Sequence, residues 1–160
     1  MIIRVSLARQ KLYLSDDTGA TVSEWSVSTA LRGAEEQRGS YCTPRGRLLI
    51  RAKIGAGHPV NTVFVGRRPS GEIFSPELDA AFPERDWILT RILWLSGCEP
   101  GFNRLGDVDT MRRYIYIHGT PDRVKMGEAA SHGCIRMRGA EILDLFERVP
   151  VYTPVEITED

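Results

Sequence analysis

The chain has 160 residues, and its 21 Lys and Arg residues balance 21 Asp and Glu residues to a net charge of zero. This neutrality argues against a nucleic-acid-binding protein, which normally carries a basic excess or stripe, and the apolar runs are too short and too interrupted by Arg to predict a membrane span. The length predicts one domain, residues 1–160, with its own hydrophobic core.

Alternating apolar and polar residues dominate the first half of the chain and predict strands with one buried face. The predicted strands are Ile3–Leu7, Leu12–Leu14, Val22–Val27, Leu48–Ile50 and Val63–Val65. A turn signal at Asp16–Gly19 separates the second strand from the third, so the chain opens as a hairpin of strands.

The middle of the chain, from Gly55 to Asp109, is rich in Gly, Pro and turn residues. We expect it to hold the loops that shape a functional site. A short helix is predicted within it over Pro76–Phe82, because Ser75 is a favourable N-cap and Pro76 suits the first helical position.

In the last third of the chain, apolar and polar residues alternate again, and a second helix is predicted. Tyr114–Ile117 predicts a strand that leads into His118, and Val151–Ile157 predicts another, with Pro154 favouring an edge position. Apolar residues at helical spacing predict a short amphipathic helix over Ile142–Val149, just before a proline. The predicted fold is therefore mostly β, with one or two short helices.

Three cysteines are an odd number, which suits a reducing compartment better than a disulfide framework. The first residues lack the basic, apolar and small-residue regions of a signal peptide. We therefore expect the protein to act in the cytoplasm.

The densest reactive cluster is Ser131-His132-Gly133-Cys134-Ile135-Arg136, with His118-Gly119 upstream. A thiol becomes a useful nucleophile when an imidazole or a helix N-terminus stabilises its thiolate. Gly133 allows close approach of a substrate, and the N–H groups of Gly133 and Cys134 are candidate donors to a developing oxyanion. The cluster predicts a cysteine nucleophile, Cys134, served by His118.

This cluster resembles the signature of the L,D-transpeptidase catalytic domain family, in which a His and a loop precede Ser/Thr-His-Gly-Cys and then an apolar residue and Arg or Asn. The resemblance extends to Val5–Leu14, Trp25–Thr29 and Thr43–Gly46, which look like the family's earlier landmarks. It implies a β-sandwich-like catalytic fold that covers most of the chain and needs no metal or organic cofactor.

The resemblance also implies roles for individual residues. Cys134 would attack the carbonyl of the third residue of a peptidoglycan stem peptide, release the terminal D-Ala and form a thioester. His118 would keep the thiol ionised, oriented through the carbonyl of Gly119. The residues expected to shape the pocket and the oxyanion hole are Ser131, His132, Gly133 and Arg136. Carbapenems acylate the family's cysteine, so they are expected to label this one.

The expected partners are peptidoglycan stem peptides or muropeptides, with no nucleic acid and no membrane. In the cytoplasm the available stems are soluble, recycled muropeptides or precursors, and water is the abundant acceptor. We therefore predict an L,D-carboxypeptidase that trims tetrapeptide stems to tripeptides during cell wall recycling. The alternative is a transpeptidase that forms 3-3 cross-links or exchanges D-amino acids.

Two other classes of function remain as alternatives. His118, His132 and Cys134, with His58 or Cys98, are a possible zinc set, although they lack the close ligand pair of zinc fingers. A non-catalytic module that binds stem peptides is the other, and the intact Cys134 argues against it.

Arg136 and the large aromatic residues each allow two interpretations. Arg136 either binds the carboxylates of an acidic stem or pairs with an acidic side chain of the protein. Trp87, Trp94 and Phe102 either line a pocket or, as is commoner for large aromatics, belong to the core.

Overall fold

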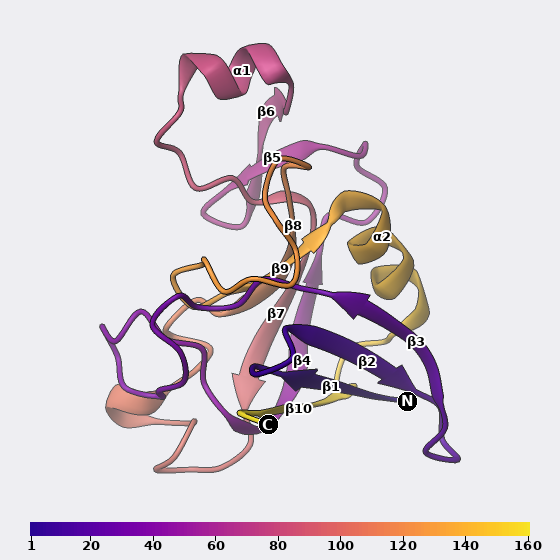
Figure 1. The fold of residues 1–160 in the computed structure, drawn as a ribbon, viewed down its shortest axis with the longest axis vertical. Coiled ribbons are helices and arrows are strands. Elements are labelled where there is room, and N and C mark those ends of the chain that lie inside the picture. Colours follow the sequence, from indigo (N-terminus) through magenta and orange to yellow (C-terminus); the bar gives the residue numbers. More distant parts are fainter.

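The computed structural model describes residues 1–160 and shows a curled, ten-stranded sheet with two short α-helices (Figure 1). Along the sheet the strands follow the order β3-β2-β1-β10-β4-β7-β5-β6, and β8 branches off β7 to pair with β9. The strands are β1 (Ile2–Ser6), β2 (Lys11–Ser15), β3 (Thr21–Ser26), β4 (Gly46–Ile54), β5 (Thr62–Val65), β6 (Arg68–Ile73), β7 (Leu89–Gly97), β8 (Tyr116–Thr120), β9 (Ile135–Arg138) and β10 (Pro154–Thr158).

The helices are α1 (Pro76–Ala81) and α2 (Gly139–Arg148), and a single 3-10 turn spans Gly106–Val108. Neither α-helix has the length and apolar character needed to cross a bilayer. Helix α1 begins as the sequence predicts, since the Ser75 hydroxyl accepts a hydrogen bond from the backbone N–H of Leu78 at 3.1 Å. It stands at the far end of the molecule from the chain termini (Figure 1).

The main core lies where the sheet curls around α2. This helix buries Ile142, Leu145 and Phe146, and they belong to one cluster with Ile117 and Ile135 of the neighbouring strands. Each such side chain contributes about 1.5–3 kcal/mol relative to an exposed one, so α2 is fixed firmly over one face of β8 and β9. The opposite face of these two strands is left for other groups.

The mostly β architecture with two short helices is confirmed, but the predicted edge position of Pro154 is wrong. Strand β10 lies inside the sheet, parallel to β1 on one side and antiparallel to β4 on the other. Pro154 is the first residue of β10, a place in a strand where the missing N–H is tolerated.

The segment from Gly55 to Asp109 supplies loop residues to the cavity described below, as expected, and it also contains more strand than the sequence predicted. It contains β5, β6, α1 and β7, and β7 is nine residues long and central. The sequence of β7 shows no polar alternation because both of its faces are buried, with Ile92 against Phe64 and Tyr116 and with Leu93 in the main core.

The strand predicted over Tyr114–Ile117 is shifted toward the C-terminus. Strand β8 begins at Tyr116 and runs on through His118 to Thr120. Tyr114 lies outside it with a φ of 58°, a left-handed conformation that ends the extended pattern.

The end of β7 depends on close contact between Gly97 and Asn103. The Asn103 amide is fully buried, donates to the carbonyls of Arg45 and Arg47 and accepts from the N–H of Glu99. A Cβ on residue 97 would lie 2.1 Å from the Asn103 carbonyl oxygen, so a side chain there has no space.

We therefore predict that Gly97→Ala lowers the free energy of unfolding by about 3 kcal/mol, because backbone rather than a flexible side chain must move. Urea denaturation measures this change. Gly139→Ala is the matched control, since its Cβ would lie 3.6 Å from the Thr90 hydroxyl oxygen, an ordinary van der Waals contact. Equal stability of the two variants would contradict the prediction.

Candidate active site

The pairing of β8 with β9 brings His118 and Cys134 to the same face of the sheet. The two strands are parallel, with Ile117 opposite Ile135 and His118 opposite Arg136, and Cys134 directly precedes β9. Side chains alternate along a strand, and Ile117 and Ile135 point into the core under α2. His118 and Cys134 therefore point to the face that α2 leaves uncovered.

The Cys134 thiol makes hydrogen bonds to the backbone at the start of β8 and just before it. Its Sγ accepts from the N–H of Tyr116 at 3.3 Å and donates to the carbonyl of Tyr114 at 3.4 Å. Burial raises the pKa of the Cys134 thiol to about 12, and the charge of Asp86 acts in the same direction, against the Tyr116 N–H and Arg136. The resting thiol is therefore protonated at neutral pH.

The His118 ring is buried and fixed in one tautomer. Its Nδ1 lies 2.7 Å from the carbonyl oxygen of Gly119, and since a carbonyl only accepts, Nδ1 carries the proton. Burial lowers the pKa of His118, so the ring is neutral and its Nε2 is free to accept a proton. Gly119 thus has the orienting contact that the resemblance implied.

The ionisation of the thiol by His118, which the resemblance implied, stays a prediction, since no direct hydrogen bond joins the two side chains. The hydrogen bonds of the Sγ go to Tyr114 and Tyr116, and His118 is not among its partners. Burial raises the pKa of the thiol and lowers that of the imidazole, and both shifts favour the neutral forms.

Ser131 and Gly133 shape the loop that presents the thiol. The Ser131 hydroxyl donates to the Cys134 carbonyl at 2.6 Å and accepts from the Gly133 N–H at 3.2 Å. The Gly133 N–H is thereby occupied, whereas that of Cys134 makes no hydrogen bond within the protein. Of the two candidate oxyanion donors, Cys134 N–H is the one available.

Thr43 anchors this loop, a role that sequence reasoning missed. Its hydroxyl donates to the Gly133 carbonyl at 2.9 Å and accepts from the N–H of Ala30 at 3.1 Å. Gly133 has a φ of 135°, and a Cβ there would lie 3.2 Å from the Cys42 carbonyl oxygen. Thr43 lies in a landmark segment of the resemblance, which was the only signal of its importance.

Arg136 is paired within the protein. Its Nη2 lies 3.0 Å from Oδ1 of Asp86, and its side chain is only 14% exposed. The structure therefore favours the acid-pairing interpretation of Arg136 and adds Asp86, which no sequence motif marked, to the site. His132 is exposed, with its ring 6.0 Å from that of Tyr41 in an edge-on arrangement.

A cavity of about 470 Å³ opens onto the thiol. It is lined by Gly66, Arg67, Asp86, Ile88, Tyr114, Tyr116, Ser131, His132, Cys134 and Arg136. Four of the seven predicted site residues therefore line this cavity, namely Ser131, His132, Cys134 and Arg136. His118, Gly119 and Gly133 lie behind it and hold or orient the groups in front.

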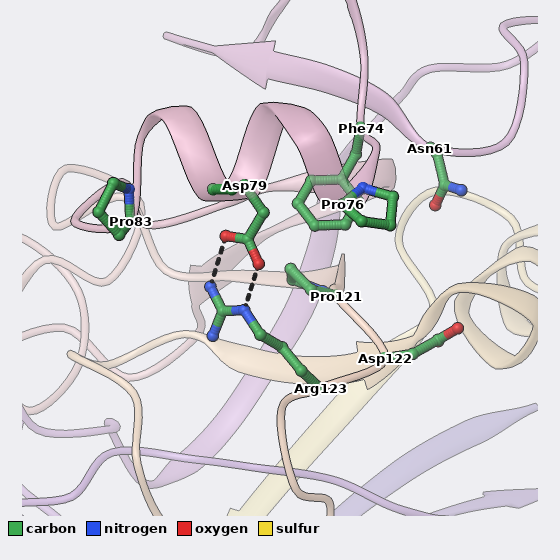
Figure 2. A pocket seen from close by; sticks show the side chains of 9 residues that line it. Asn61, Phe74, Pro76, Asp79, Pro83, Pro121, Asp122 and Arg123 are labelled. Atoms are coloured by element: carbon green, nitrogen blue, oxygen red, sulfur yellow. Dashed lines mark hydrogen bonds and ion pairs between the residues drawn. The ribbon is translucent and has the colours of Figure 1, made fainter.

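A second cavity, of about 560 Å³, lies between α1 and the loop at Pro121–Arg123, and Figure 2 shows the Asp79–Arg123 ion pair inside it. It contains no nucleophile. A smaller hollow of about 200 Å³ shares Arg123 with this cavity and Arg136 with the cavity at Cys134. Through these shared residues the three hollows adjoin one another from α1 to the thiol, and together they are called the groove.

The residues of the zinc alternative do not assemble. No group of three His, Cys, Asp or Glu side chains is placed to hold a metal ion. His58 packs edge-on against Phe64 with ring centroids 6.3 Å apart. All three cysteines are free thiols.

The family model for the L,D-transpeptidase catalytic domain matches residues 1–157. Among curated relatives, YqjB of Bacillus subtilis, a candidate L,D-transpeptidase, is 43% identical over 60 residues, which are 38% of this chain and 32% of YqjB. The probable L,D-transpeptidase YbiS of Escherichia coli is 44% identical over 48 residues, 30% of this chain and 16% of YbiS.

The fold is also similar to solved structures. L,D-transpeptidase 3 of Mycobacterium tuberculosis, in complex with a faropenem-derived adduct, has a TM-score of 0.59 and 17% identity, with 99% of this chain and 60% of that chain covered. An L,D-transpeptidase of Enterococcus faecium has a TM-score of 0.59 and 16% identity, with 98% of this chain and 49% of that chain covered. The chain thus spans less than two thirds of each of these proteins, and the likeness in structure supports the fold.

Asp86 should control the reactivity of the thiol. Because the Asp86 charge raises the pKa of Cys134, we expect Asp86→Asn to lower it and to speed alkylation by iodoacetamide at pH 8 by about three- to tenfold. In the wild type the alkylation rate of Cys134 should keep rising with pH up to the pKa of its thiol, about 12. Peptide mass spectrometry separates Cys134 from the other two thiols. Asp122→Asn, an exposed loop change, is the control, and equal rates in both variants would refute the role of Asp86.

Thr43→Val should loosen the nucleophile loop. The change removes the donor to Gly133 and leaves the buried Ala30 N–H unpaired, which costs about 1–3 kcal/mol of unfolding free energy. Thr21→Val, in an exposed position on β3 without a side-chain hydrogen bond, is the control. Chemical denaturation of both variants should separate them, and coincident curves would show that the Thr43 bonds contribute nothing.

Proposed function

The chain belongs to the L,D-transpeptidase catalytic domain family, and from this premise we propose that it is a cysteine-dependent L,D-carboxypeptidase of peptidoglycan tetrapeptide stems. The observation that carries the proposal is the position of Cys134. Its thiol opens onto a cavity and lies on the same face of β8 and β9 as the free Nε2 of a buried, neutral His118. A nucleophile and a base in that relation suit acyl transfer.

In the first half of the proposed reaction, the Cys134 sulfur attacks the carbonyl carbon of the third stem residue, and the thiol proton passes to Nε2 of His118. The oxyanion that forms is held by the N–H of Cys134, which has no partner in the protein. As the peptide bond breaks, His118 returns the proton to the leaving amine of D-Ala. A thioester on Cys134 remains.

In the second half, water attacks the thioester carbonyl and His118 accepts a proton from it. The carbon–sulfur bond breaks, His118 returns its proton to the leaving sulfur so that the Cys134 thiol is restored, and the tripeptide's new carboxylic acid loses its proton to solvent. The depressed pKa of His118 keeps the ring in the base form at neutral pH, ready for each of the two attacks. Loss of activity is expected only when acid protonates this ring.

Transpeptidation is the second candidate, and the groove favours it in one respect. Hollows extend from Cys134 in two directions, toward α1 and, past Ser131 and His132, into a cavity of about 440 Å³ beside Tyr41. Two arms suit a donor stem and an acceptor stem, whose amine would replace water. The three free thiols support the carboxypeptidase, because they fit the reducing cytoplasm, where soluble muropeptides are the available stems.

Incubation with a disaccharide tetrapeptide, followed by intact-mass analysis, tests the proposal. We expect loss of one alanine, also when a free D-amino acid is present in excess. Cys134→Ala should reduce the rate by at least about a thousandfold, since it removes the nucleophile. Cys98→Ala, which changes a free thiol outside the cavity, is the matched control.

Each outcome of this experiment decides something. A cross-linked dimer or an exchanged D-amino acid would replace the carboxypeptidase by the transpeptidase. Absence of every product, or equal activity in Cys134→Ala, would overturn acyl transfer itself. Fractionation of cells tests the cytoplasmic location independently.

A further inference from the structure

The turn between β5 and β6 contains a residue that the backbone alone does not favour. The two turn residues, Gly66 and Arg67, have φ values of 56° and 64°, and Val65 pairs with Arg68 across the hairpin. Such mirror-image turns prefer Asn-Gly, because side chains with a Cβ resist positive φ. An Arg at the second position costs conformational energy, which points to a use for its side chain.

The Arg67 side chain folds back over the cavity at Cys134 instead of extending into solvent. Its guanidinium carbon lies 4.5 Å from the centre of the Trp94 ring and 4.8 Å from that of Tyr114. Its Nη1 donates to the Tyr116 hydroxyl at 3.0 Å. Three aromatic side chains thus hold the cation in one place, as a wall of the cavity.

Arg67 has no acidic partner, unlike the other arginine of this cavity. Arg136 is paired with Asp86, whereas no carboxylate lies within ion-pair distance of Arg67. A guanidinium has five N–H donors, and hydrogen bonding within the protein uses one of them. The cavity therefore offers one fixed positive charge with most of its donors unused.

Tyr116 connects this charge to the nucleophile. Its hydroxyl accepts from Arg67, and its backbone N–H donates to the Cys134 sulfur at 3.3 Å. Arg67 and the thiol therefore both contact Tyr116 and line one cavity, so a single substrate can meet both. A stem peptide carries carboxylates on residues next to its scissile bond, and the guanidinium fork binds carboxylates through two parallel hydrogen bonds.

We propose that Arg67 binds a carboxylate of the substrate and makes the enzyme selective for stems in which that carboxylate is free. The proposal rests on the proposed function, since it names the substrate group that the site recognises. The carboxylate is either that of the terminal D-Ala or that on the side chain of a third residue such as diaminopimelate.

Three tetrapeptides distinguish the two sources. The first has both carboxylates free, the second has its terminal carboxylate amidated, and the third has its side-chain carboxylate amidated. We expect Arg67→Met to raise KM for the free peptide by about ten- to a hundredfold, with a smaller change in kcat. For the wild type, KM should rise by a similar factor when the carboxylate that Arg67 binds is amidated. For Arg67→Met, KM should be the same for that amidated peptide and for the free one. Arg67→Lys, which keeps the charge, should recover part of the loss.

Arg68→Met is the matched control, because Arg68 is the next residue of the same hairpin, is exposed and does not line the cavity. Thermal unfolding shows whether each variant folds. An equal loss on all three peptides would mean that Arg67 only packs against the aromatic rings, and unchanged kinetics would mean that it does not act at all. Either result overturns the proposal.

Calorimetric binding separates this proposal from the proposed function. If the wild type cleaves none of the peptides, acyl transfer on stems fails, but Cys134→Ala and the double variant Cys134→Ala/Arg67→Met still report binding of the same three peptides. Tighter binding of the free peptide that disappears with Arg67→Met would support the carboxylate site. Equal binding of free and amidated peptides would refute it.

Discussion

The parallel register of β8 and β9 is the constraint on which the site depends. It sets His118 opposite Arg136 and places Cys134 just before β9, so that three polar groups share the face opposite α2. The packing of Ile142 and its neighbours on the other face holds that register, because a slip by one residue would turn Ile117 and Ile135 out of the core. The chemistry and the core therefore use alternate residues of the same two strands.

Burial then decides the protonation states. The same low-polarity surroundings raise the pKa of the thiol and lower that of the imidazole, so the neutral form of each is favoured. Beside these two groups, Asp86 and Arg136 form an ion pair, with Nη2 of Arg136 3.0 Å from Oδ1 of Asp86.

The hairpin of β5 and β6 adds a cation to a site otherwise composed of neutral or paired groups. Arg67 at its tip, and Tyr114 beside it, both have left-handed backbone conformations and both line the cavity. The backbone energy that these two residues cost is consistent with a use for their side chains at the cavity. The aromatic rings around Arg67 stabilise its charge without neutralising it.

The mostly β class, both helices and the candidate nucleophile could be predicted from the sequence, because each depends on local spacing, and the resemblance of the contiguous cluster gave the family. Ser75 caps α1 as its type predicts, and the Ser-His-Gly-Cys cluster is contiguous. The sequence could not place β7, whose two buried faces erase the alternation, or Pro154, whose neighbours are strands from distant parts of the chain. The pairing of Arg136 with Asp86, the bond from Thr43 to the Gly133 loop and the position of Arg67 at the cavity became visible only in the folded chain. Each of these contacts joins residues far apart in sequence, and a local pattern carries no information about them.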